Sequence, residues 1–344
     1  KKKGGAPAAA PAAVKPSKGE AQIFPVKKAS GTSAFTGKQL DFKKFYLSTA
    51  INYANGAPHL GHAYEAITSD IISRYHRVVG RDVFFLTGAD EHGQKVATNA
   101  AKLGKAPIEV CDMYVDGFKK LNARCNISND GYVRTTSERH KLNATKLWQK
   151  CEANGDIYLD TYEGWYNIRE EKFVPENEAK MNDYKDTDGK PLTKVKEESY
   201  FFRMGKYQKQ LIEHYENNPE FVLPLSRRNE MLARLKKDEL RDLSASRTTF
   251  DWGVPIPNDP SKKHVMYVWF DALSNYLTGV DALLDDESAL KRFWPCNCHI
   301  IGKDILWFHS VIWPTMLMSA GVALPKTICA HGFVNAAGGF YQML

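Results

Sequence analysis

Two histidines separated by two residues, His59 and His62, are the side chains best suited to chemistry in the first part of the chain. They follow an apolar run at 45–51 and precede apolar residues at helical spacing, so they stand where a strand gives way to a helix. A helix N-terminus there offers free N–H groups and a positive dipole end to phosphate. Imidazoles donate hydrogen bonds, and Gly61 lets a nucleotide approach the backbone. The pattern predicts a triphosphate site, the alternative being two surface histidines near a turn.

Two further polar clusters also follow apolar runs. Asp90 comes after the run at 82–88 and begins the segment 90–93. A carboxylate at a strand end accepts charge-assisted hydrogen bonds from a substrate ammonium group, although capping of the next helix explains it equally well. Asp304 follows the run at 299–301, where an acidic residue would bind ribose hydroxyls or cap a helix. Three such clusters together favour a functional site over three separate coincidences.

Apolar and aromatic side chains at helical spacing would line a pocket beside these clusters. A stripe of this kind is most often core packing, and only its position next to the polar clusters favours a binding role. One expected helix contributes Ile305, Phe308 and His309, and another contributes Trp269, Ala272 and Tyr276.

The elements that must position these residues follow from hydrophobic periodicity. Apolar strands alternate with amphipathic helices, which is typical of a parallel sheet covered by helices on both faces. Between about 156 and 245, short aromatic runs and polar stretches predict an inserted α+β module. Strands are expected at about 44–51, 82–88, 299–301 and 326–331, and 265–270 is expected to be a strand that runs into a helix. Helices are expected at about 61–79, 93–103, 107–123, 137–153, 205–217, 226–237 and 304–320.

Composition narrows the class of protein. A chain of 344 residues with 43% hydrophobic content can bury a large core. Residues 1–40 hold eight of the 47 basic residues but one of the 40 acidic ones, so the remaining 304 residues carry 39 of each. The body is therefore neutral, and attraction to RNA must come from a local patch or from the tail. Residues 1–40 are rich in Ala, Pro and Lys, which predicts a disordered tail. No apolar run approaches the ~18 residues of a membrane span.

Cysteine usage favours a reducing compartment without a disulfide framework, because no two cysteines form a C-x-x-C pair. Cys296, Cys298 and His299 lie close together, but a metal site there lacks a second ligand pair, so packing is the expected role. The six cysteines are at positions 111, 125, 151, 296, 298 and 329.

The clusters belong to a set of motifs that resembles the class I aminoacyl-tRNA synthetases, and within them the methionyl-tRNA synthetase family. The resemblance covers about residues 42–339 in the family's order and spacing. The motifs lie at 53–62, 87–93, 162–166, 242–247, 268–273, 301–305 and 331–333. The resemblance implies an α/β fold, a Rossmann-type doubly wound parallel sheet of the HUP-like class, with an inserted α+β connective-peptide domain. The implied parts are a tail at 1–40, half-domains at 41–155 and 246–344, and the insertion at 156–245.

The resemblance also implies a reaction and the residues that serve it. The reaction is activation of methionine with ATP and Mg²⁺, followed by transfer to tRNA(Met). His59 and His62 are the implied catalytic residues, and Asp90 would hold the methionine ammonium group. Implied ATP contacts are His59, Gly61, His62, Gly302, Asp304, His331 and Gly332. The implied methionine pocket consists of Ala50, Ile51, Tyr53, Asp90, Trp269, Ala272, Tyr276, Ile305, Phe308 and His309.

Two departures from the family pattern change these expectations. Residues 160–245 contain no cysteine, so we expect no structural zinc, as in zinc-free forms of the family, and no other metal site. Gly338 and Gly339 are followed by 340–344 rather than by a KMSKS-type loop. We therefore expect a C-terminally truncated chain without that loop or the anticodon-binding domain. Since the loop lysines serve the transition state, methionine binding should survive better than adenylation.

Two other functions fit part of the pattern. A small nucleotidyltransferase shares the HxGH-type loop but lacks the insertion and the 269–276 cluster. A non-catalytic methionine- or tRNA-binding remnant would account for the missing loop. The lysine-rich tail either attracts tRNA weakly, in a salt-dependent way, or serves as a spacer. We expect a cytoplasmic protein without membrane association, with mitochondrion or plastid as the alternative locations.

Overall fold

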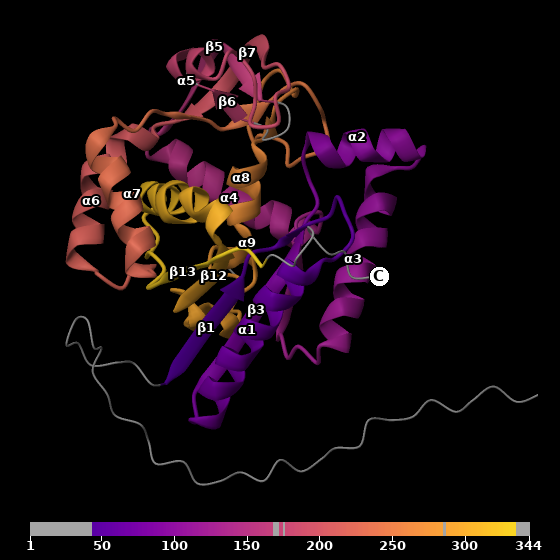
Figure 1. Cartoon of the computed structure of the whole chain (residues 1–344), viewed down its shortest axis with the longest axis vertical. Coiled ribbons are helices and arrows are strands. Elements are labelled where there is room, and N and C mark those ends of the chain that lie inside the picture. Colours follow the sequence, from indigo (N-terminus) through magenta and orange to yellow (C-terminus); the bar gives the residue numbers. More distant parts are fainter. Residues whose placement is uncertain (1–42, 168–171, 175, 285–286, 335–344) are drawn as a thin grey trace, which may run out of the picture.

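A seven-stranded parallel sheet forms the centre of the molecule (Figure 1). The structure is a computed structural model, and it describes residues 43–167, 172–174, 176–284 and 287–334. The strand order is β2-β3-β1-β12-β13-β8, and β4 pairs with β3. The strands are β1 (Lys44–Thr49), β2 (Asn52–Tyr53), β3 (Asp82–Asp90), β4 (Gly131–Arg134), β8 (Val222–Leu223), β12 (Cys298–Gly302) and β13 (Ile328–His331). This sheet confirms the expected α/β class.

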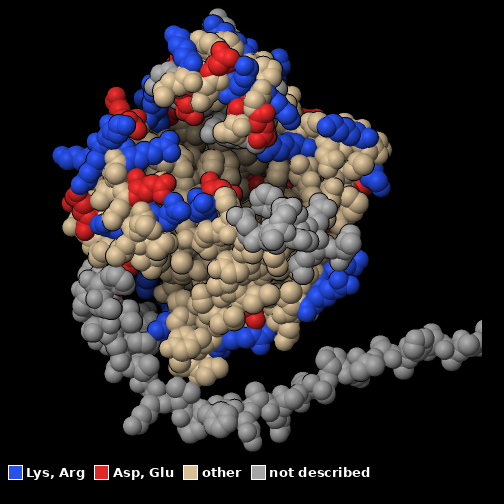
Figure 2. All heavy atoms as spheres, viewed as in Figure 1, with Lys and Arg blue, Asp and Glu red and all other residues tan. Residues whose placement is uncertain are grey.

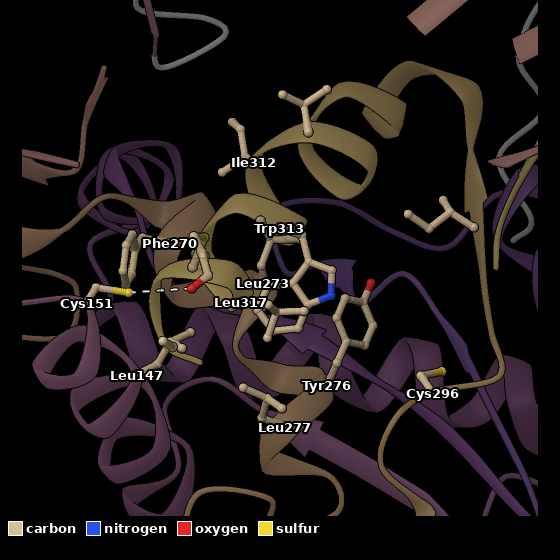
Figure 3. Packing of buried hydrophobic residues seen from close by; sticks show 14 of the residues in the cluster. Leu147, Cys151, Phe270, Leu273, Tyr276, Leu277, Cys296, Ile312, Trp313 and Leu317 are labelled. Carbon is tan, nitrogen blue, oxygen red and sulfur yellow. Dashed lines mark hydrogen bonds between the residues drawn. The ribbon is translucent and has the colours of Figure 1, made fainter. Parts of the chain in front are cut away.

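Helices cover both faces of the sheet because successive strand side chains point to opposite sides. On one face Leu47, Phe85 and Ile300 pack with Ile72 of a long helix. On the other face Tyr46 joins the main core, part of which Figure 3 shows around Trp313. The helices flanking the first strands are α1 (Leu60–Val78), α2 (Gln94–Leu103), α3 (Pro107–Arg124) and α4 (Glu138–Ala153). Burial on both faces explains why the strands are continuous apolar runs.

A separate antiparallel sheet, at the top of Figure 1, forms within the expected insertion. Its order is β6-β5-β7-β9, and the longest pairing runs from Ile157↔Phe202 to Tyr166↔Thr193. The elements of this sheet and its connection are β5 (Ile157–Asn167), β6 (Lys172–Val174), α5 (Glu176–Met181), β7 (Thr193–Phe202) and β9 (Leu243–Ser244).

The chain leaves this sheet and returns to the main body before β9. Helices α6 (Gln208–Asn217) and α7 (Leu225–Lys237) form close to their expected positions, and Leu211 and Tyr215 of α6 belong to the main core. Between the two helices, β8 pairs with β13 at the edge of the central sheet. Part of the range 156–245 is thus built into the central sheet.

The segment 265–270 is a strand that runs into a helix, as expected, but its strand is short. Only Val265–Met266 (β11) is extended, and it pairs with Ser246–Arg247 (β10) outside the central sheet. Helix α8 (Val268–Leu273) follows at once, and α9 (Asn275–Thr278) comes after it. All of 265–268 and 270–273 are buried, so the run lacks the polar face that separates helical from strand periodicity.

The expected long helix at 304–320 is helical but not uniform. It begins as a 3₁₀ turn (Lys303–Ile305), passes through a π-helical turn (Phe308–Ile312) and ends as α10 (Trp313–Ser319). Pro314 lies in the first turn of α10 and has no N–H to donate to the preceding turn, which is consistent with the change of helix type before it. Sequence periodicity also did not predict the short strands β2 and β4 or the 3₁₀ turns Met204–Tyr207 and Ala289–Phe293.

Within the described ranges, no helix is both long and apolar enough to cross a membrane. The expectations of a disordered tail at 1–40 and of a missing loop after Gly339 fall on residues outside those ranges.

Candidate active site

The carboxyl ends of three neighbouring strands bring the predicted clusters together. Strands β3, β1 and β12 are adjacent, so residues after their ends meet at one edge of the sheet. A cavity of about 330 Å³ lies there, a size at the lower end of the range for small-molecule sites, roughly 300–1,000 Å³. It is lined by Ala50, Ile51, Tyr53, Asp90, Lys95, Val268, Trp269, Ala272, Leu273, Asn275, Tyr276, Asp304, Ile305 and His309.

Most side chains expected to form the amino-acid pocket line this one cavity. Nine of the ten do so; the tenth, Phe308, stacks on Trp269 with ring centroids 3.9 Å apart and planes 9° apart. The lining residues that were not predicted from the sequence are Lys95, Val268, Leu273 and Asn275, and Asp304 was assigned to ribose only. Lys95 is the second residue of helix α2 and stands five residues after Asp90, so its position on the helix that follows Asp90 was the available signal.

A pair of uncharged polar side chains lies in one wall of the cavity. His309 Nδ1 is 3.0 Å from the carbonyl oxygen of Ile305, which only accepts hydrogen bonds, so Nδ1 carries the proton. His309 Nε2 therefore accepts from the Tyr276 hydroxyl at 2.7 Å. Burial lowers the pKa of His309 to about 4 and raises that of Tyr276 well above its usual value. At neutral pH this wall is polar but uncharged.

Asp90, the last residue of β3, is not a helix cap. The residue that caps α2 is Gly93, and its cap has no side-chain hydrogen bond. The backbone carbonyl of Asp90 accepts from the Ala54 N–H at 2.7 Å, while the next side chain, Glu91, turns away from the cavity to Arg134 at 2.7 Å. These contacts remove the capping explanation for Asp90 and fix its backbone beside the cavity.

The two histidines at the start of α1 form a reciprocal cap. His59 Nδ1 accepts from the Gly61 N–H at 3.1 Å, and His62 Nδ1 accepts from the His59 N–H at 3.1 Å. The rings stack 3.7 Å apart. Burial lowers the pKa of His59, and burial together with His59 lowers the pKa of His62 to about 3. Both imidazoles are thus neutral with the proton on Nε2, which leaves one N–H donor on each.

The remaining predicted residues surround the same strand ends but do not line the cavity. His331, at the end of β13, donates from Nε2 to Glu65 Oε2 of α1 at 2.9 Å, and this contact raises the pKa of His331. A Cβ added at Gly302 would lie 2.5 Å from Asp304 Oδ1, so a side chain at this position would displace the Asp304 carboxylate. His59, Gly61, His62, Gly302, His331 and Gly332 are all absent from the cavity lining.

No three His, Cys, Asp or Glu side chains in the described part of the chain group as metal ligands would. Cys296 is buried, and its thiol contacts the carbonyl oxygens of Tyr46 at 3.3 Å and Cys298 at 3.4 Å, which is a packing role. Burial raises the pKa of the Cys298 thiol well above its usual value.

Comparison with known proteins places the chain in a family. The family model described as tRNA synthetases class I (M) matches residues 45–183 and 181–340. The chain belongs to this family. It is 49% identical over 301 residues to a methionine--tRNA ligase from Rhizobium meliloti (strain 1021), which covers 87% of this chain and 58% of that protein. A methionine--tRNA ligase from Rickettsia conorii is 49% identical over 294 residues, covering 86% and 57%.

Solved structures of the family have the same fold. The Mycobacterium tuberculosis methionyl-tRNA synthetase in complex with methionyl-adenylate matches with a TM-score of 0.80 and 48% identity over 84% of this chain and 57% of that one. Its apo form matches with a TM-score of 0.72 and 46% identity. The chain spans a little over half the length of the curated relatives that it matches. The family resemblance and the fold class expected from the sequence are thus confirmed.

Proposed function

We propose that this chain binds methionine in the 330 Å³ cavity and, with ATP, converts it to methionyl-adenylate for transfer to tRNA(Met). The observation that carries the proposal is the cavity lining itself. Asp90 supplies a carboxylate for an ammonium group, and the aromatic wall with its uncharged Tyr276–His309 pair suits a thioether. Membership of the family and the methionyl-adenylate bound by a relative support the same assignment.

In the proposed reaction, a carboxylate oxygen of methionine attacks the α-phosphorus of ATP. The new bond joins that oxygen to phosphorus, the bond to the bridging oxygen of the β-phosphate breaks, and pyrophosphate leaves with the electron pair. The chain contributes alignment and charge stabilisation rather than covalent chemistry. ATP enters as its Mg²⁺ complex.

The histidine pair is assigned to the phosphates of ATP. Among the residues that the structure describes, no hydrogen bond occupies the Nε2–H of His59 or of His62, and both donors stand at the N-terminus of α1, where the helix dipole also favours negative charge. Gly61 lies between them, within the same turn. Because both rings are neutral, they act as hydrogen-bond donors through Nε2–H and stabilise developing negative charge without carrying a positive charge of their own.

The nucleoside is assigned to the ends of β12 and β13. Gly302 and Asp304 follow β12, and the Asp304 carboxylate would accept from ribose hydroxyls. His331 and Gly332 follow β13 and are assigned to adenine. Because β12 and β13 are neighbours, these residues lie side by side at the sheet edge.

The closeness of fit between the cavity and the methionine side chain limits how well the chain can discriminate against similar amino acids. A hydrophobic pocket distinguishes substrates that differ by one methylene by only ~1–3 kcal/mol. The Phe308 ring behind Trp269 restricts movement of that wall. We therefore expect discrimination against shorter apolar amino acids to be larger than discrimination against unbranched analogues of the same length.

The tRNA would approach between the antiparallel sheet and α2. Figure 2 shows Lys and Arg side chains over α2 and, mixed with Asp and Glu, over the antiparallel sheet at the top, on both sides of a hollow in this face. Local positive charge on a neutral body favours contact with phosphates there, and the lysine-rich tail at 1–40 would add a weak, salt-dependent contribution.

The organisation of the chain is part of the proposal. We assign residues 41–155 and 246–344 to the catalytic halves and 156–245 to the insertion, which holds no structural zinc. The cellular location that fits this role is the cytoplasm, with the mitochondrion or plastid as the alternative.

Two measurements on this chain test the proposal and separate it from a non-catalytic binding remnant. Calorimetric titration with methionine measures binding, and methionine-dependent ATP–pyrophosphate exchange measures activation. Binding together with exchange supports the enzyme, even when exchange is slowed. Binding without any exchange supports the remnant. A chain that does not bind methionine contradicts both the enzyme and a methionine-binding remnant.

A further inference from the structure

A buried chain of hydrogen bonds lies behind the candidate cavity and is not part of its lining. Asp271, on α8, is 1% exposed. Its Oδ2 accepts from His92 Nδ1 at 2.6 Å, and its Oδ1 accepts from His140 Nε2 at 2.7 Å. His140 Nδ1 in turn lies 3.1 Å from the Thr278 hydroxyl oxygen. All four side chains are at least nine-tenths buried.

Three of the four segments joined by these hydrogen bonds adjoin the cavity walls. His92 stands two residues after Asp90, in the turn that follows β3. Asp271 lies between Trp269 and Ala272 on α8. Thr278 stands two residues after the lining residue Tyr276 on α9. His140 lies on α4, which contributes no residue to the cavity lining.

The carboxylate of Asp271 links two other elements to helix α8. Each oxygen bonds to a different element, so the turn after β3 and helix α4 are both fixed to α8 through one side chain. Asn at this position would keep one acceptor oxygen but turn an NH₂ group toward an imidazole N–H, so one of the two contacts would be lost. In a buried site that loss is not compensated by water.

The turn after β3 has a second set of anchors on its other side. Glu91 binds Arg134 and Thr136, and the Trp252 indole donates to the Glu91 carbonyl oxygen at 2.6 Å. These contacts hold the turn to β4 and to the loop at 250–253. Only the His92–Asp271 contact ties it directly to α8, the helix that carries the facing wall of the cavity, among the side-chain hydrogen bonds of the described residues.

We propose that Asp271 is a positioning residue for the amino-acid substrate. By holding His92 and His140 it fixes the distance between the Asp90 carboxylate and the Trp269–Tyr276 wall, and so sets methionine affinity without touching methionine. The inference rests on the proposed function. If the role of Asp271 were purely structural, replacing it would lower folding stability and would weaken the binding of both methionine and ATP or of neither.

The test compares Asp271→Asn with a matched control, Asp156→Asn. Asp156 is also fully buried and accepts from Lys206 at 2.7 Å, Ser319 at 2.7 Å and Tyr207, none of which lines the cavity. Calorimetric titrations of the full chain with L-methionine and with a non-hydrolysable ATP analogue give two dissociation constants for each variant. We expect Asp271→Asn to weaken the binding of methionine at least tenfold and the binding of the ATP analogue less than twofold. Asp156→Asn should lower the melting temperature and change neither constant more than twofold.

A second pair of variants covers the case in which Asp271→Asn does not fold. His92→Asn places an amide N–H where Nδ1 donates, whereas His92→Leu removes the donor at similar size. We expect the methionine affinity of His92→Asn to lie within threefold of that of the wild type, and the methionine affinity of His92→Leu to fall tenfold or more. Equal methionine affinity in folded Asp271→Asn or His92→Leu, or an equal loss in Asp156→Asn, overturns the positioning role. A wild-type chain that binds no methionine overturns the proposed function itself.

Discussion

His331 donates a hydrogen bond from Nε2 to Glu65 Oε2 at 2.9 Å and thereby joins the end of β13 to helix α1, across 266 positions of sequence. Both side chains are mostly buried, with exposed fractions of 17% and 13%. Helix α1 begins with the His59–His62 pair, and β13 ends at the residues assigned to adenine. The contact therefore fixes the separation between the residues assigned to the phosphates of ATP and those assigned to its adenine.

Glu65→Gln is expected to lower the pKa of His331. The hydrogen bond to Glu65 is the main reason that this pKa is raised, because the carboxylate stabilises the imidazolium, and Gln keeps an acceptor but no charge. NMR titration of the His331 ring protons measures the effect. Glu109→Gln, a first-turn residue of α3, serves as the control and should leave His331 unchanged. An unshifted His331 in Glu65→Gln would show that the contact does not govern its charge.

The fold should lose stability as the pH falls below neutrality. Burial lowers the pKa of His62 to about 3 and of His76 and His309 to about 4, whereas unfolded histidines titrate near 6.5. Between those values the unfolded state binds more protons, so the free energy of unfolding must rise with pH. The stability that these residues contribute is complete above pH ~6.5 and declines as the pH falls toward about 4.

Urea denaturation at pH 5, 6 and 7 measures this dependence. We expect the free energy of unfolding to increase at each step, and the increase to be smaller in a His76→Gln variant, which removes one of the three groups. A free energy of unfolding that stays constant, or is highest at pH 5, would contradict the burial of neutral histidines.

Gly302→Ala should weaken ATP binding more strongly than methionine binding, because Asp304 is assigned to ribose and is only one of the residues that line the amino-acid cavity. The added Cβ would lie 2.5 Å from Asp304 Oδ1, the end of a side chain that can rotate away, so the fold survives while the carboxylate moves. Gly56→Ala is the matched control, since a Cβ there has no atom within 4 Å. Calorimetry with an ATP analogue should show a tenfold or larger loss for Gly302→Ala only. Unchanged affinity in this variant would remove Asp304 from the nucleotide site.

Residues next to strand ends were predictable from the sequence, and contacts between distant elements were not. Asp90 and Asp304 each follow an apolar run, and parallel strands place the residues after such runs at a common edge. That rule, with helical spacing for Trp269 and His309, predicted half of the cavity lining, whereas Ala50, Ile51 and Tyr53 were implied only by the family resemblance. The fold class followed in the same way from strands that are apolar on both faces.

The partners of buried polar side chains depend on packing that periodicity does not encode. Nothing in the spacing of His92, His140 and Asp271 indicates that they meet, because they come from three different elements. The exact point at which the strand gives way to a helix within 265–270 was hidden for a related reason: a short run that is buried except at Trp269 has no polar face, so strand and helix patterns coincide. The short strand β8 belongs to the central sheet through its pairing with β13, and no local sequence pattern predicts that pairing.

Methionine binding through Asp90 is the central claim, and calorimetric titration of the chain with methionine before and after Asp90→Asn tests it most directly. Loss of a charged hydrogen-bond partner costs ~1.5–3 kcal/mol, so we expect affinity to fall roughly 10- to 150-fold. Asp82→Asn, at the opposite end of the same strand and half exposed, is the control and should bind as the wild type does. Equal methionine affinity in Asp90→Asn and the wild type, or no binding by the wild type at millimolar methionine, would contradict the account.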